Sequence, residues 1–149
     1  MRAFFVTLLF SLFVFSSCTQ DETCREKTAV LLRAEFYGFN SANKINIDSI
    51  TVFGLQQDSL YKNVKNINKI ALPLNNSEEQ SIFVMNLNGT HDTLRVSYTN
   101  ADYFISYSCG MIITHKIDTV ITTNHVIKNL KIVNRDINTA DVQHLQIFF

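Results

Sequence analysis

The most regular feature of the chain is an alternation of apolar and polar residues that begins near Thr28 and recurs to the C-terminus. Successive side chains of a strand point to opposite faces of a sheet, so a period of two predicts strands with one buried face. The pattern predicts strands over residues 28–37, 47–55 and 142–149. In the first of these, the expected buried positions are Val30, Leu32, Ala34 and Phe36.

The best hairpin signal lies in the middle of the chain, where residues 81–87 and 93–98 flank Asn88-Gly89. This pair readily adopts the positive φ that tight hairpin turns need. Residues 81–87 are apolar at both alternating sets of positions, which favours an interior strand. Residues 69–74 look extended but contain Pro73, which lacks an N–H to donate, so an edge strand is expected there.

The remaining segments are less regular. Asn100-Ala101-Asp102 predicts a turn, followed by an extended run over residues 103–116 in which Gly110 marks a bulge or bend. Residues 117–122 are then expected to pair with that run. Two segments allow either reading: residues 58–68 fit a short strand or a helical turn, and residues 126–133 fit a helical stripe or a strand.

Together these segments amount to eight or nine short strands with no clear helix. Short strands at regular spacing predict an all-β fold, an antiparallel two-sheet β-sandwich of the Ig-like or Greek-key type. A small β-barrel is the alternative.

Charge excludes some partners. The chain has 13 basic and 13 acidic residues and a formal net charge of zero. Neither the basic patch expected of a nucleic-acid-binding protein nor a polybasic membrane-binding segment is present in the sequence. We therefore expect no nucleic-acid partner.

The first 18 residues have the layout of an export signal: Arg2, an apolar run over residues 3–15, Ser16-Ser17, and then Cys18. The run is shorter than the ~20 residues that span a bilayer as a helix. Ser16-Ser17-Cys18 resembles the lipobox of bacterial lipoproteins, although Phe15 stands where leucine is usual. The resemblance implies that Cys18 is diacylated and becomes the first mature residue. An ordinary cleaved signal peptide is the alternative.

This interpretation divides the chain into a signal peptide (residues 1–17), a tether (18–27) and one β-sandwich domain (28–149). It places the protein outside the cytoplasm, lipid-anchored in the outer membrane and facing either the periplasm or the cell surface. Gln20-Asp21-Glu22 resembles the acidic export signal of some surface lipoproteins of the Bacteroidota, and a solvated linker would have the same composition.

The other two cysteines are Cys24 and Cys109, which are expected to pair in an oxidising compartment. Such a bridge closes a loop of about 86 residues and contributes about 4 kcal/mol in the chain-entropy model. It would also hold the folded body close to its anchor. Two unpaired thiols are the alternative.

No catalytic, cofactor or metal site can be recognised in the sequence. The four histidines His91, His115, His125 and His144 lack metal-ligand spacing, although His115 and His125 would meet if a hairpin joined them. Gly-x-Ser-x-Gly, phosphate-loop and calcium-loop motifs are absent. We therefore expect a protein that is not an enzyme and holds no cofactor.

Six aromatic residues are candidates for an exposed sugar-stacking platform: Tyr37, Phe39, Tyr61, Tyr103, Phe104 and Tyr107. Twelve phenylalanines and no tryptophan favour a core role for most aromatic residues of this chain.

A tripeptide of Asp, a hydroxyl residue and an aliphatic residue occurs four times. It is similar to the O-glycosylation acceptor motif of exported Bacteroidota proteins, which makes the hydroxyl residues candidate sites: Ser49, Ser59, Thr93 and Thr119. Asp-Ser and Asp-Thr also commonly mark strand starts, and the two interpretations are compatible because strand starts are exposed.

Several short motifs together resemble a family of small uncharacterised Bacteroidota lipoproteins. They are the lipobox, Cys24, residues 70–74, Ser108-Cys109-Gly110 and the terminal residues 144–149. The resemblance implies no activity. We expect a non-enzymatic binding or structural module for another envelope protein; a glycan- or small-ligand-binding lipoprotein is the second hypothesis and a hydrolase the third.

Overall fold

The computed structural model describes residues 23–55, 59–87 and 89–149. The expected signal peptide, Cys18 and the first part of the tether lie outside this described part. Within it the chain forms ten strands and no helix, and therefore has no helix that could cross a membrane. The strands are β1 (Leu32–Tyr37), β2 (Ile47–Gly54), β3 (Ser59–Ile67), β4 (Lys69–Leu72), β5 (Gln80–Leu87), β6 (Thr90–Ser106), β7 (Gly110–Thr122), β8 (Asn129–Ile132), β9 (Asp136–Ile137) and β10 (Leu145–Phe148).

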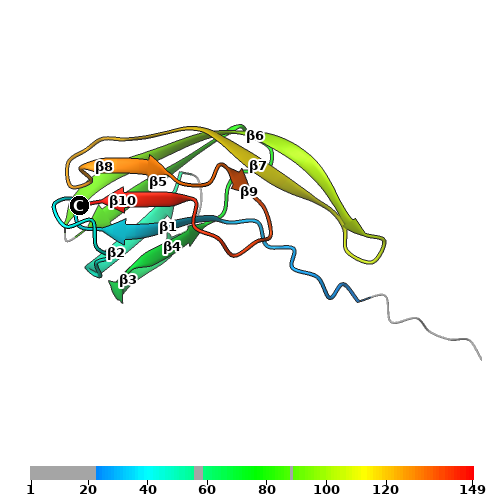
Figure 1. The fold of residues 1–149 in the computed structure, drawn as a ribbon, viewed down its shortest axis with the longest axis horizontal. Helices are drawn as coiled ribbons and strands as arrows, with labels where there is room; N and C mark the ends of the chain where they lie inside the picture. The colour runs from blue at the N-terminus through cyan, green and yellow to red at the C-terminus, as the bar shows by residue number, and fades with distance from the viewer. Residues whose placement is uncertain (1–22, 56–58, 88) are drawn as a thin grey trace, which may run out of the picture.

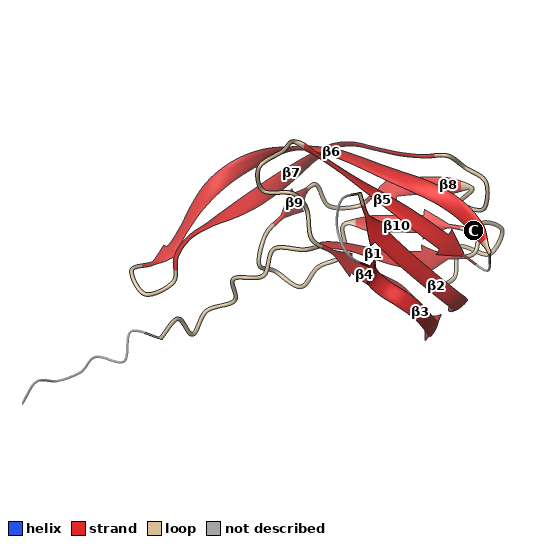
Figure 2. Ribbon diagram, turned by 180° about the vertical axis from the view of Figure 1, so that it is seen from behind, coloured by secondary structure: helices blue, strands red, loops and turns tan. Residues whose placement is uncertain are grey.

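The strands are arranged in two sheets that face each other (Figures 1 and 2). One sheet has the order β4-β1-β10-β8 and the other the order β3-β2-β5-β6-β7-β9. Each sheet has two edges and neither closes into a barrel, so the predicted β-sandwich is confirmed. Alternate residues of both sheets form the core; in β1, Leu32, Ala34 and Phe36 are fully buried, as their alternation predicts.

Several strand predictions are confirmed by the pairing. β5 lies between β2 and β6, and β4 is an edge strand that ends directly before Pro73. β5 and β6 form the expected hairpin with Leu87 opposite Thr90, although Asn88 lies outside the described residues. Both ambiguous segments contain strands, β3 and β8.

Two features of the predicted architecture need correction. The described residues contain ten strands rather than eight or nine, and the shortest of them, β9, has only two residues. In addition, β1 pairs with β10 in parallel, with Ala34 opposite Leu145, so the smaller sheet is not wholly antiparallel. Alternation reveals which face of a strand is buried, but it carries no information about which distant strand lies alongside.

The predicted turn at Asn100-Ala101-Asp102 is wrong, because these residues lie inside the 17-residue strand β6. Residues 117–122 do not pair back on the preceding run, since they continue β7. Gly110 lies at a bulge, as predicted: the register of the β6–β7 pair shifts between Phe104, which is opposite Met111, and Ser106, which is opposite Gly110. Gly110 is the first residue of β7, and its φ of 72° closes the β6–β7 turn. At the position of the predicted turn, the Asn100 side chain donates hydrogen bonds to the carbonyl oxygens of Asn76 and Glu78, at 3.2 and 2.9 Å.

β6 and β7 are much longer than the strands beside them. β5 accompanies β6 only as far as the Gln80–Ser97 pair, whereas β6 and β7 stay paired to Ser106 and Gly110. Residues 99–114 therefore form a two-stranded ribbon that projects from the sandwich (Figure 1). We call this ribbon the arm.

Candidate functional site

The outer half of the arm is uncharged and rich in exposed apolar side chains. No residue from Tyr103 to Thr114 carries a charge. Four large side chains of this stretch are exposed: Tyr103 (56%), Phe104 (51%), Tyr107 (101%) and Met111 (63%). Contiguous exposed apolar surface on a soluble domain commonly marks an interaction site. The arm is therefore the strongest candidate for a functional surface.

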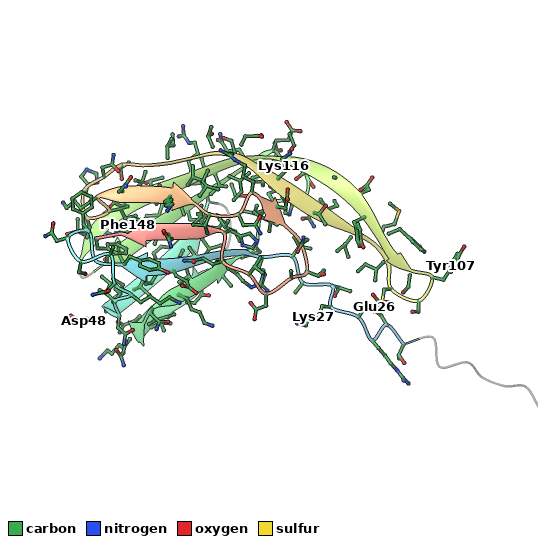
Figure 3. All side chains as sticks on the ribbon, in the orientation of Figure 1. Glu26, Lys27, Asp48, Tyr107, Lys116 and Phe148 are labelled. Atoms are coloured by element: carbon green, nitrogen blue, oxygen red, sulfur yellow. A yellow bond between two sulfur atoms is a disulfide. The ribbon has the colours of Figure 1, made fainter. Side chains whose placement is uncertain are left out.

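Three of these side chains form one patch at the end of the arm. Phe104 and Met111 are directly opposite each other in the ribbon. The rings of Phe104 and Tyr107 meet edge to face, with centroids 5.4 Å apart. We call Phe104, Tyr107 and Met111 the tip patch. Figure 3 shows Tyr107 at the far end of the arm, pointing away from the sandwich.

The tip of the arm is covalently joined to the N-terminal segment. Cys24 and Cys109 form the expected disulfide, with Cα atoms 4.6 Å apart. The sequence predicts that this bridge holds the folded body close to its anchor, and the location of Cys109 corrects that prediction. Cys109 belongs to the turn that ends the arm, where its N–H donates to Ser106 Oγ at 3.2 Å. The disulfide thus joins the tether to the arm tip, not to a strand of the sandwich.

A cleft of about 680 Å³ lies at the base of the arm. β9 covers β7 only at His115 and Lys116, after which the chain turns away through residues 138–140. The cleft separates that segment from the arm, and we call it the arm cleft. Its lining from the arm includes Ala101, Tyr103, Ile112 and Thr114.

The backbone edge of β7 is unpaired beyond the end of β9. The Ile117 N–H donates to the Arg135 carbonyl oxygen at 2.8 Å, which places the outward-directed groups of β7 at odd-numbered residues. In an antiparallel strand every second residue directs its N–H and C=O to the same side. By this alternation Met111 and Ile113 present theirs where no described strand pairs with them. This open sheet edge lies beside the arm cleft, and Met111 and Ile113 line a neighbouring hollow of about 370 Å³.

The base of the arm is held by a buried polar network. The Tyr98 hydroxyl donates to the Asn75 carbonyl oxygen at 2.9 Å and lies 2.7 Å from Ser81 Oγ. His115 Nδ1 lies 2.7 Å from Asn100 Oδ1. Burial lowers the pKa of His115, which favours the neutral ring. Because a carboxamide oxygen only accepts, we assign the proton of the neutral ring to Nδ1. Such contacts fix the direction in which the arm leaves the sandwich.

A protein-family model described as "Family of unknown function (DUF6452)" matches residues 49–149, about two thirds of the chain. The chain belongs to DUF6452. No curated protein and no solved structure matches it. The expected likeness to an uncharacterised family is confirmed at this level.

The DUF6452 match covers the whole arm, the arm cleft and Cys109, and it begins after Cys24. The candidate surface thus lies within the part of the chain that the family model describes. The match itself carries no activity, so the function has to be argued from the site.

The four histidines of this DUF6452 chain do not converge. His115 and His144 are buried, whereas His91 and His125 are exposed. His144 Nδ1 accepts from the Arg33 backbone N–H at 3.0 Å, and burial and the Arg33 charge lower its pKa. No hairpin joins His115 to His125, because β7 continues past His115 to Thr122. Among the described residues, no three His, Cys, Asp or Glu side chains gather in a way that could hold a metal.

Asp92 belongs to one of the four tripeptides, and nothing in that motif predicts its burial. Its carboxylate is fully buried. It accepts four hydrogen bonds, from the Thr123 hydroxyl and from the backbone N–H groups of His125, Val126 and Ile127, at 2.7–2.9 Å. Burial raises the pKa of Asp92, but these bonds outweigh it and lower the pKa to about 2. Asp92 thus holds the segment that follows β7.

The candidate O-glycosylation sites occupy different environments. Ser59 and Thr119 are exposed, whereas Ser49 and Thr93 are half-buried. Ser49 Oγ donates to Asn63 Oδ1 at 2.7 Å. Only Ser59 stands at a strand start, so the strand-start interpretation is wrong for the other three. Modification of the four residues stays a prediction, and Ser59 and Thr119 are the two whose side chains are exposed.

The six candidate platform aromatics do not form one surface. Tyr37 and Tyr61 are half-buried, and the Tyr61 hydroxyl is bonded to Ala71. Phe39 is exposed, but its N–H donates to the Phe149 carbonyl oxygen, at the C-terminal end of the sandwich. Tyr103, Phe104 and Tyr107 alone gather on the arm of the DUF6452 chain.

Proposed function

We propose that this protein is exported, anchored in the outer membrane by acyl chains on Cys18, and acts by binding another envelope protein rather than by catalysis. The observation that carries the proposal is the open edge of β7 beside the arm cleft. A partner would contribute an extended segment there, continuing the antiparallel ladder that β9 begins.

The arm cleft has the features of a site for an added strand. Main-chain groups at an exposed edge supply affinity, and pockets for alternate side chains supply specificity. Met111 and Ile113 offer the main-chain groups, and Ala101, Tyr103 and Ile112 offer apolar contact. β9 already pairs with His115 and Lys116 of the same edge, so the site needs only a continuation of existing pairing.

The same geometry favours a protein partner over a glycan. Sugar rings stack on aromatic faces, so a platform needs rings that share one plane. On the arm, the Phe104 and Tyr107 rings are inclined at 74°. Tyr103 is the one aromatic residue that lines the arm cleft.

Export is supported by two independent features. Residues 1–18 have the order of a lipoprotein signal, and the Cys24–Cys109 disulfide belongs to an oxidising compartment. The net charge near zero leaves membrane attachment to the acyl chains, which contribute about 0.8 kcal/mol per buried CH₂.

Replacement of Cys18 by alanine is expected to release the protein from membranes, because the thiol is the acceptor of the lipid. The measurement is fractionation of cells grown with a fatty-acid probe: the native chain is labelled and sediments with membranes, and Cys18→Ala is neither labelled nor sedimented. Cys24→Ala is the matched control and should keep its label. Unlabelled native protein would refute the anchor.

A photo-crosslinking residue at Ala101 is expected to yield one discrete adduct in living cells, identified by mass spectrometry as an extended segment of an envelope protein. The same residue at Thr90, exposed at the other end of β6, is the control and should yield none. Ile113→Pro removes an N–H of the open β7 edge and should abolish the adduct.

Because Ile113 is half-buried, the thermal melt of Ile113→Pro has to be compared with that of the native chain. If the fold is lost, Ala140→Lys serves instead, since Ala140 is an exposed residue of the opposite wall. Equal adducts at Ala101 and Thr90, or no adduct at Ala101, would contradict binding in the arm cleft.

A further inference from the structure

We propose that the tip patch contacts the interface of the same bilayer that holds the acylated Cys18, so that the protein has two membrane contacts. This inference rests on the lipid anchor proposed above. It assigns a role to a part of the arm that the cleft does not use.

The first step concerns reach. Cys18 and Cys24 are six residues apart, and an extended chain spans at most about 3.6 Å per residue, or roughly 20 Å here. The disulfide places the Cα atom of Cys109 4.6 Å from that of Cys24. The arm tip is therefore held within about 25 Å of the residue that carries the lipid, while each polar layer of a bilayer is itself about 5–8 Å thick.

The second step concerns orientation. The sandwich extends from the base of the arm to an opposite end where β10 finishes (Figure 1). Glu26 and Lys27 of the tether lie on the side of the sandwich from which the arm projects, and Phe148 lies at the other end (Figure 3). Since the tether is bound to the tip, the tip is the part of the folded chain nearest to the anchor.

The third step concerns chemistry. Tyrosine and other amphipathic aromatic side chains prefer the level of the lipid headgroups, where one end of the ring is apolar and the other is hydrated. The tip patch consists of Phe104, Tyr107 and Met111, and Tyr107 is fully exposed. Residues 103–114 are uncharged, so no charged side chain of the ribbon itself has to be desolvated when the tip enters the interface. The charged residues Arg25 and Glu26, which follow Cys24, are exposed.

The outer arm also lacks the charged residues that usually protect a solvent-exposed ribbon. Exposed sheet edges are usually protected by charged residues, lysine above all, which discourage association with other chains. The outer arm has none, yet the flanking residues Asp102 and Lys116 are charged and exposed. The longest uncharged stretch of β6 and β7 is thus the one that the disulfide joins to the tether.

The test uses a single fluorophore, since the chain contains no tryptophan. Full-length Tyr107→Trp, acylated and reconstituted into vesicles of phosphatidylethanolamine and phosphatidylglycerol, reports on the tip. Phe39→Trp is the matched control, because Phe39 is an exposed aromatic residue at the opposite end of the sandwich. Both positions are exposed, so neither substitution should disturb the core.

We expect the emission of Tyr107→Trp to shift to shorter wavelength in vesicles and to be quenched by lipids that carry a nitroxide near the headgroup. Phe39→Trp should show neither change. Acylation of the same preparation is measured with a fatty-acid label. If the label is present and Tyr107→Trp emits as it does in water, the tip contact is overturned and the anchor stands.

Two other outcomes also overturn the inference. An unlabelled preparation refutes the anchor, and the second membrane contact is refuted with it. A blue shift in native envelopes but not in pure lipid vesicles means that a protein covers the tip patch, and the bilayer is then not its partner.

Discussion

Replacement of Asp92 by asparagine is expected to lower the free energy of unfolding by about 3 kcal/mol, because a buried carboxylate with four donors is replaced by an amide with one acceptor oxygen. The Asp92 oxygens each accept two bonds, one pair from Thr123 and His125 and the other from Val126 and Ile127. In the amide, the NH₂ group would face two backbone donors. The measurement is urea denaturation near neutral pH.

The pH dependence gives this prediction a second readout. The pKa of Asp92 is lowered from 3.8 to about 2 in the folded chain. A lowered folded pKa means that the unfolded chain takes up the proton first, so the contribution is complete above about pH 5 and is lost as the pH falls through 3.8 toward 2. The difference in pKa corresponds to about 2 kcal/mol. Asp92→Asn should lack this loss, so its stability should converge on that of the native chain as the pH falls.

Asp118→Asn is the matched control. Asp118 precedes Thr119 in the same kind of tripeptide, but it is exposed on β7, so its replacement should change stability by less than about 0.5 kcal/mol. Similar effects of the two substitutions would show that the Asp92 bonds do not stabilise the fold.

Removal of the disulfide by Cys24→Ser together with Cys109→Ser is expected to lower the free energy of unfolding by about 4 kcal/mol in the chain-entropy model. The bridge joins residues 85 apart in sequence, so it restricts the unfolded chain strongly. Both cysteines lie outside the sandwich core, so the effect should come from the unfolded state, with the strands preserved. Circular dichroism and urea denaturation would measure the two quantities.

Reduction of the native chain provides the control, because it opens the bridge without changing a side chain, and it should reproduce the loss seen in the double variant. Non-reducing mass spectrometry should find no free thiol at Cys24 or Cys109 in the native protein. Free thiols at both positions, or a loss below about 1 kcal/mol on reduction, would contradict a stabilising bridge.

The local features of the fold could be read from the sequence wherever one strand contained the whole signal. Leu32, Ala34 and Phe36 alternate and are buried, and Pro73 ends an edge strand. The interior position of β5 follows from its apolar residues on both faces. The pairing of Cys24 with Cys109 followed from setting aside Cys18 as the expected lipid acceptor, which left two cysteines to pair.

The candidate site could not be read in this way. Asn100 and Asp102 have the composition of a turn, but Asn100 is satisfied by the carbonyl oxygens of Asn76 and Glu78, and β6 continues. The open edge of β7 exists because β9 stops after two residues. The burial of Asp92 depends on donors more than 30 residues away in sequence.

The sequence alone determined the all-β class, the two-layer arrangement and the two cysteines that pair, because strand periodicity and cysteine number are properties of the chain itself. The tertiary structure decided that the disulfide joins the N-terminal segment to the end of a projecting arm, and that this arm has an open edge and an uncharged apolar tip. It also decided that the side chain of Asp92 is buried. These properties depend on where neighbouring strands end and on which distant donors meet a side chain, and no local pattern of residues encodes either.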